Sequence, residues 1–192
     1  MTESKRQFFK DLKKGYNLVP LTKTKPCRIS PQSLWLSLPN KETSVLLESS
    51  YTSGQNGRFS FLGIDPFLSC WVSQKKLFVN HAAISGCPIT NLKNLFAKYT
   101  SPSRFEIAPF LCGAMGFFGY EAAQYFEKIP VAKKSDLKLP EIGLRFFHKV
   151  FVFDHLKQQL TLSAAGDNLK CVEEALEAME SLAIKAEKKH LA

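Results

Sequence analysis

Residues 45–66 read VLLESSYTSGQNGRFSFLGIDP, and this stretch predicts two strands with polar groups gathered at one end. An apolar strand ends at Glu48 and Ser49, and a second strand begins at Arg58. A small zwitterion needs such groups, because its carboxylate pairs with arginine and its ammonium with glutamate. The plainer interpretation stays open, since polar side chains are common where strands run into loops. Arg58 could equally pair with Glu48 or with Asp65.

The rest of the chain predicts an α+β fold with mainly antiparallel strands and one domain over residues 1–192. Strands are expected at 44–49, 58–63, 67–73, 76–80, 108–118, 144–153 and 158–163. Helices are expected at 3–14, from Ser30-Pro31 to before Pro39, at 91–99, at 120–129 and at 167–189. The strand at 108–118 is expected to be buried on both faces, and 133–140 to be a polar loop. The apolar stripe of the last helix must pack on the sheet or on another molecule.

The composition favours a soluble cytoplasmic protein. The chain has 192 residues, 45% of them hydrophobic, and 16 phenylalanines, which argues against disorder. Its start is charged rather than signal-like, and no apolar run reaches the length of a membrane span. The five cysteines contain no CxxC pair and do not suggest a disulfide framework. The net charge of +9 raises nucleic acid as a partner, but the lysines gather near the chain ends without a recognition motif, so none is expected.

Catalytic and metal-binding motifs are absent from the sequence. It has no phosphate-binding GxxxxGK[ST], no GxSxG elbow and no HExxH pair. The glycines of GAMGFFG (113–119) have the wrong spacing for a dinucleotide loop and are interpreted as sheet packing. His148 and His155 have no visible nucleophile beside them, and Asp154 is interpreted as a turn residue. No catalytic residue and no metal ligand is therefore predicted.

Six blocks of the sequence, taken together, resemble anthranilate synthase component I in its N-terminal region. They are NLVPL (17–21), LLESS (46–50), GRFSFLGIDPF (57–67), GAMGFFGYEAAQYFEKIP (113–130), LPEI (139–142) and FVFDHLKQQLTL (151–162). Their order and spacing match that family across most of the chain. Aminodeoxychorismate synthase component I shares much of this layout and is the close rival.

The resemblance implies a fold and a binding site. The fold would be part of a two-sheet sandwich flanked by helices. The site would be one side of the family's feedback pocket for tryptophan, formed here by Glu48, Ser49, Arg58, Phe59 and Ser60. Where the family often has Asp-x-x-Thr-Pro, residues 27–31 read CRISP, which keeps the helix start and loses the acid.

The resemblance also implies an activity that this chain is not expected to perform alone. The family converts chorismate to anthranilate and pyruvate with Mg²⁺ and with ammonia from a glutamine amidotransferase, component II. Its catalytic motifs, GTRPRG and a DLxRND-type stretch, are not found in residues 131–192. We therefore expect a catalytically silent chain without its own cofactor, whose partners are tryptophan, the catalytic domain and component II. A free-standing amino-acid-binding or partner-binding domain is the alternative, and a gene remnant is a weaker one.

Overall fold

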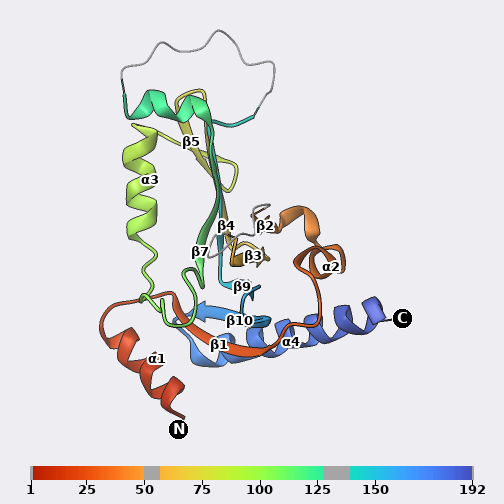
Figure 1. The fold of residues 1–192 in the computed structure, drawn as a ribbon. Helices are drawn as coiled ribbons and strands as arrows, with labels where there is room; N and C mark the ends of the chain where they lie inside the picture. The colour runs from red at the N-terminus through yellow and green to blue at the C-terminus, as the bar shows by residue number, and fades with distance from the viewer. Residues whose placement is uncertain (1, 50–56, 128–138, 192) are drawn as a thin grey trace. The chain divides into compact units, whose positions relative to one another are not determined.

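The computed structural model describes residues 2–49, 57–127 and 139–191 and divides the chain into two compact units. The first unit combines Met1–Pro66, Tyr99–Gly113 and Phe147–Ala192, and the second combines Phe67–Lys98 and Ala114–Phe146. Each unit is built on one five-stranded antiparallel sheet with helices beside it (Figure 1). The predicted α+β class with antiparallel strands is confirmed. The single domain over residues 1–192 stays a prediction.

The sheet of the first unit contains both strands of the 45–66 stretch. Its strand order is β1-β10-β9-β3-β2. The strands are β1 (Val19–Pro26), β2 (Val45–Leu47), β3 (Phe59–Ile64), β9 (Lys149–Asp154) and β10 (Gln159–Gly166). Strand β3 pairs with β2 on one side and with β9 on the other. Strand β1 was not predicted, because the second half of VPLTKTKP is polar, which an edge strand tolerates.

The first unit contains the three helices that the sequence predicts for it and one short helix that was not predicted. They are α1 (Glu3–Lys13), α2 (Pro31–Leu36), the short 3-10 helix η1 (Lys41–Thr43) and α4 (Leu169–Leu191). At α2 the Ser30 hydroxyl accepts a hydrogen bond from the Ser33 N–H at 3.1 Å, with Pro31 as the first helical residue. At α4 the Asn168 side-chain oxygen accepts from the Cys171 N–H at 3.2 Å.

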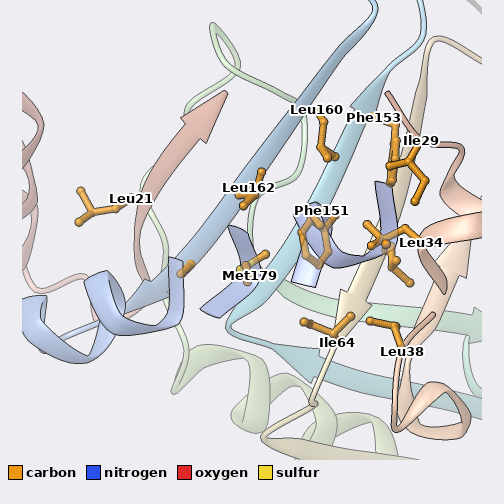
Figure 2. Close-up of a cluster of buried hydrophobic side chains, with 14 of the residues drawn as sticks. Leu21, Ile29, Leu34, Leu38, Ile64, Phe151, Phe153, Leu160, Leu162 and Met179 are labelled. Carbon is orange, nitrogen blue, oxygen red and sulfur yellow. The ribbon is translucent and has the colours of Figure 1, made fainter. Parts of the chain in front are cut away.

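The apolar stripe of α4 packs on the sheet, which is one of the two places that the sequence allowed. Val172, Met179 and Ala183 are buried in one cluster with side chains of β9 and β10. Figure 2 shows Met179 beside Leu162 and Phe151 in this cluster. Two ion pairs join the same helix to β1: Lys23 Nζ lies 2.6 Å from Glu180 Oε2, and Lys25 Nζ lies 2.8 Å from Glu187 Oε1.

The sheet of the second unit has the strand order β6-β5-β4-β8-β7. Its elements are β4 (Leu68–Ser73), β5 (Lys76–Val79), β6 (Ala82–Ile84), α3 (Pro88–Ala97), β7 (Gly113–Phe118), η2 (Tyr120–Tyr125) and β8 (Ile142–Phe147). Burial alternates along β4, so that Leu68, Cys70 and Val72 face one side of the sheet. Helix α3 lies on that side, where the ring of Phe96 contacts that of Phe146 with centroids 5.2 Å apart.

The predicted strand at 108–118 is wrong in both length and burial. Strand β7 begins only at Gly113, and Phe117 and Phe118 are exposed. The preceding residues Ala108, Leu111 and Cys112 are buried, but in the first unit. One apolar run therefore serves two units, and its composition alone could not reveal the division.

The predicted strand at 144–153 is two strands that belong to different sheets. Strand β8 ends at Phe147 and β9 begins at Lys149, with His148 between them. The His148 carbonyl accepts the Ala165 N–H, and His148 Nδ1 lies 2.8 Å from the Ala165 carbonyl oxygen. Burial lowers the pKa of His148. The predicted hairpin across Asp154 to Lys157 is confirmed, because β9 pairs with β10.

The predicted helix at 120–129 is a 3-10 helix over Tyr120–Tyr125. Its expected last residues, and most of the loop predicted at 133–140, fall outside the described residues. Within the described parts of the chain, none of the helices combines the length and the apolar character that a membrane crossing requires.

Candidate functional site

The candidate site lies at one end of the first unit's sheet. The antiparallel pairing of Leu47 with Phe61 brings the end of β2 and the start of β3 to the same edge. Glu48 follows β2 directly, and Arg58 precedes β3. The connecting residues 50–56 lie outside the described part of the chain.

A pocket of about 530 Å³ opens at this end of the sheet. Its wall comes from the segment that enters α2, from the end of β2, and from the turn between β9 and β10. The lining residues are Cys27, Arg28, Ile29, Ser30, Pro31, Gln32, Glu48, Phe153, Asp154, His155 and Gln158. This volume lies within the range of small-molecule sites, about 300–1,000 Å³.

Asp154 is the most heavily bonded side chain of the pocket. Its carboxylate accepts from Arg58 Nε at 3.1 and 3.2 Å and from Arg58 Nη2 at 2.6 Å. It also accepts the backbone N–H groups of Leu156 and Lys157, as a turn residue does. Burial alone would raise the pKa of Asp154, but the hydrogen bonds from Arg58 and Lys157 outweigh burial and lower it. Arg58 therefore pairs with Asp154, not with Glu48 or Asp65.

The hydrogen bond between Ser60 and His155 joins β3 to the same turn. Ser60 is 2% exposed, and its Oγ lies 2.7 Å from His155 Nε2. The sequence did not reveal this pair, because the two residues are 95 positions apart. Among the described residues no carboxylate bonds to the other ring nitrogen of His155. The pair therefore holds the turn against the sheet rather than forming a hydrolytic triad.

Glu48 also lines the pocket and is held by α2. The Gln32 Nε2 group donates to both carboxylate oxygens of Glu48, at 2.9 Å to Oε1 and 2.7 Å to Oε2. Both side chains are solvent-exposed, so the carboxylate can still accept further donors.

The five predicted site residues have different positions in the structure. Glu48 lines the pocket, whereas Ser49 is exposed just after the end of β2. Arg58 and Ser60 do not line the pocket themselves but bond to Asp154 and His155, which do. Phe59 lies under the Arg58 guanidinium, whose carbon is 4.6 Å from the ring centroid.

The segment from Cys27 to Gln32 was missed as part of the site. A signal was present in the sequence, since its Ser-Pro step aligns with the Thr-Pro step of the family pattern. The structure places all six residues of the segment on the pocket wall.

Metal binding is not supported in the part of the chain that the structure describes. It contains no group of three or more His, Cys, Asp or Glu side chains that could hold a metal ion.

Comparison with known proteins gives consistent matches. The family model for chorismate binding enzymes matches residues 45–191. Anthranilate synthase component 1 of Acetivibrio thermocellus is 29% identical over 157 residues, which cover 79% of this chain and 32% of that protein. The same enzyme of Geobacillus stearothermophilus is 32% identical over 141 residues, covering 70% of this chain and 27% of that protein.

The fold is also that of a solved structure. The crystal structure of anthranilate synthase component I from Streptococcus pneumoniae aligns with a TM-score of 0.53 and 24% identity over 81% of this chain and 35% of that one. The chain thus spans about a third of the length of the relatives that it matches. Together with the family match over residues 45–191, these likenesses show that the chain belongs to the chorismate binding enzyme family, as a relative of anthranilate synthase component I.

Proposed function

We propose that this chain is a regulatory and structural portion of an anthranilate synthase component I and performs no chorismate chemistry by itself. The observation that carries the proposal is the pocket at the sheet end, lined by Ser30, Glu48 and His155. It lies where the resemblance implies a tryptophan feedback site. Tryptophan would bind as a zwitterion there, and Ile29 and Phe153 would offer apolar surface to its indole ring.

In this proposal, the catalytic steps belong to the part of the longer relatives that does not align with this chain. In this proposal the catalytic domain binds chorismate and Mg²⁺, and component II supplies ammonia. The described residues of this chain offer no metal cluster to replace that domain. The corresponding portion of aminodeoxychorismate synthase component I is the alternative within the same family.

Tryptophan binding is the first test, by ligand-detected NMR titration of the 192-residue chain. We expect saturable but weak binding, because an open pocket desolvates its ligand only in part. Ser49→Phe is expected to weaken binding, since it places a large ring beside Glu48. Ser181→Phe, on an exposed position of α4, is the matched control. Micromolar affinity that survives Ser49→Phe would overturn the assignment of the site.

Catalytic silence is the second test. The chain is incubated with chorismate, Mg²⁺ and ammonium, and anthranilate is followed by its fluorescence. We expect none, and measurable turnover would refute the claim that the chemistry belongs to another domain. A free-standing amino-acid-binding domain would also be silent. A neighbouring reading frame for the catalytic domain favours the first function, and tryptophan binding without such a frame favours the second.

A further inference from the structure

Helix α1 presents a basic face to solvent. Its positively charged residues recur at intervals of three and four positions, which places them on one side of a helix. They are Arg6, Lys10, Lys13 and Lys14, and all four are exposed. In the part of the chain that the structure describes, no ion pair involves any of them. These four residues form the basic face of α1.

The two acidic residues of α1 do not neutralise this face. Asp11 is 1% exposed, accepts a hydrogen bond from Gln7 Nε2 at 3.0 Å and pairs with Arg104. Glu3 lies in the first turn, and its carboxylate forms no ion pair with a described residue. Lysines in the last turn suit the negative end of the helix dipole, but Arg6 lies near the positive end. Helix stability therefore explains only part of the basic face.

The lysines next to the basic face are already paired with acidic residues of α4. Lys5 Nζ lies 2.6 Å from Glu173 Oε1. On β1, the strand that α1 contacts, Lys23 and Lys25 pair with glutamates of the same helix. These pairs reduce the positive charge around α1, and the charge that remains follows a single helix face.

Phe9 gives the basic face an apolar contact point. It lies three residues after Arg6 and four before Lys13, so it adjoins both. Its side chain is 41% exposed, and its ring packs edge to face on that of Phe8, with centroids 5.8 Å apart. Phe8 is itself 1% exposed and belongs to the core of the first unit. An exposed ring held by a buried one loses little rotamer freedom when a partner binds.

The partner that matches this surface best is an acidic helix. Two helices share the same rise per residue, so glutamates at the same intervals of three and four positions can meet the cations one by one. A membrane fits less well, because an interfacial helix buries its apolar face in lipid, whereas Phe8 of α1 is buried in the protein. Single-stranded nucleic acid stacks on several aromatic rings along a basic groove, and this face offers only Phe9.

We propose that the basic face of α1 is a docking surface for an acidic amphipathic helix of another protein, whose glutamates pair with this face and whose apolar side chains contact Phe9. A second copy of this chain is a poor occupant, because each copy carries a net charge of +9. The proposal goes beyond the proposed function, since it involves neither tryptophan nor the pocket at the sheet end.

The test titrates the 192-residue chain into a fluorescently labelled peptide and follows the anisotropy at low salt. The peptide is a synthetic helix with glutamate at positions i, i+4, i+7 and i+8 and leucine at i+3, which is the spacing of the basic face and Phe9. A second peptide has the same composition in scrambled order. A single-stranded oligothymidylate and vesicles that contain phosphatidylserine represent the other polyanions.

The test variant is Lys10→Glu/Lys13→Glu. Its matched control is Lys185→Glu/Lys188→Glu, at exposed positions near the end of α4. Thermal melts confirm that each variant is folded, and Lys10→Gln/Lys13→Gln replaces the test variant if charge reversal unfolds α1.

The wild-type chain is expected to bind the ordered peptide more tightly than the scrambled one and than either other polyanion. The test variant should weaken this binding about tenfold, whereas the control should leave it unchanged. Phe9→Ser should weaken it by a smaller factor. Added salt should weaken it as well, because exposed charges are screened.

Four results would overturn the proposal. The first is a wild-type chain that does not bind the ordered peptide, and the second is equal binding of the two peptides, which would refute the helical match. The third is an equal loss in the test and control variants, which would reduce the effect to net charge. The fourth is tighter binding of the oligothymidylate or the vesicles, lost in the test variant, which would assign the basic face to that class of partner instead.

Discussion

Asp154 organises the site at the scale of a single residue. It closes the turn after β9 through the N–H groups of Leu156 and Lys157 and anchors Arg58 at the start of β3. The neighbouring His155 bonds to the buried Ser60 of β3. One acidic side chain thus closes a turn and fixes the position of Arg58.

Replacing Asp154 with asparagine should destabilise the chain by about 1–2 kcal/mol at neutral pH, because charge-assisted hydrogen bonds are lost. The lowered pKa of Asp154 means that its contribution is present above the unfolded-state pKa, about 3.9, and is lost as the pH falls through the lower folded-state value. Asp154→Asn should therefore lose less stability than wild type between about pH 5 and that value. Urea unfolding across this range measures both effects.

Asp65→Asn is the matched control for this prediction. Asp65 pairs with Lys149 near the other end of β9, and its side chain is 48% exposed. Exposed pairs contribute only about 0–1 kcal/mol. If both variants showed the same stability and the same acid profile, Asp154 would not have the role described.

Helix α4 is held in the first unit by its apolar stripe and by ion pairs to β1. Its predicted stripe packs on β10 and β1, and lysines of β1 pair with its glutamates along one side. The apolar stripe of the last helix therefore completes the core of the first unit.

Met179→Ala should cost about 2–5 kcal/mol, because Met179 is 0% exposed and its removal leaves a cavity against Phe151 and Leu162. Ile184 lies on the same helix but is 41% exposed. Ile184→Ala is expected to cost clearly less, since much of its side chain already contacts water. Chemical denaturation of the two variants gives the comparison, and equal losses would contradict this packing.

At the scale of the whole molecule, the second unit presents an aromatic surface on the side of its sheet opposite α3. Trp71 and Phe78 stack with ring centroids 5.4 Å apart and planes 7° apart. Strand β8 follows β4 in the sheet, and Phe117 of the edge strand β7 lies over its Gly143. A Cβ on Gly143 would come within 2.8 Å of the Phe117 ring, and Phe117 is 46% exposed. Strand β6 ends the sheet with the exposed residues Ala82, Ala83 and Ile84. An apolar face beside an apolar edge strand favours association.

We expect the purified chain to self-associate through this surface in a concentration-dependent way. Phe117→Ser should shift sedimentation velocity profiles towards the monomer, because it removes exposed apolar area. Phe105→Ser is the control, since Phe105 is 75% exposed but lies outside this sheet. A monomer at every concentration tested, for the wild-type chain, would show that the aromatic surface does not associate.

Several features of this protein were determined by the sequence alone because their causes are local. Ser30-Pro31 starts a helix through a cap three residues away, and the spacing of Val172, Met179 and Ala183 defines one face of α4. Alternating or continuous apolar runs marked β2 to β5 and β10, and the ordered blocks indicated the family. Strands β1 and β6 were not predicted, because short or polar edge strands show little hydrophobic alternation.

The tertiary structure alone decided which residues share a site. Arg58 and Asp154 are 96 positions apart, and only the pairing of β3 with β9 makes them partners. The same pairing commits Arg58 to Asp154, and α2 places Gln32 against Glu48. Local propensity depends on neighbours in the chain, whereas a binding pocket depends on which distant segments meet. For this reason the sequence predicted polar groups gathered near Glu48, and only the fold showed that Arg58 pairs with Asp154 and Glu48 with Gln32.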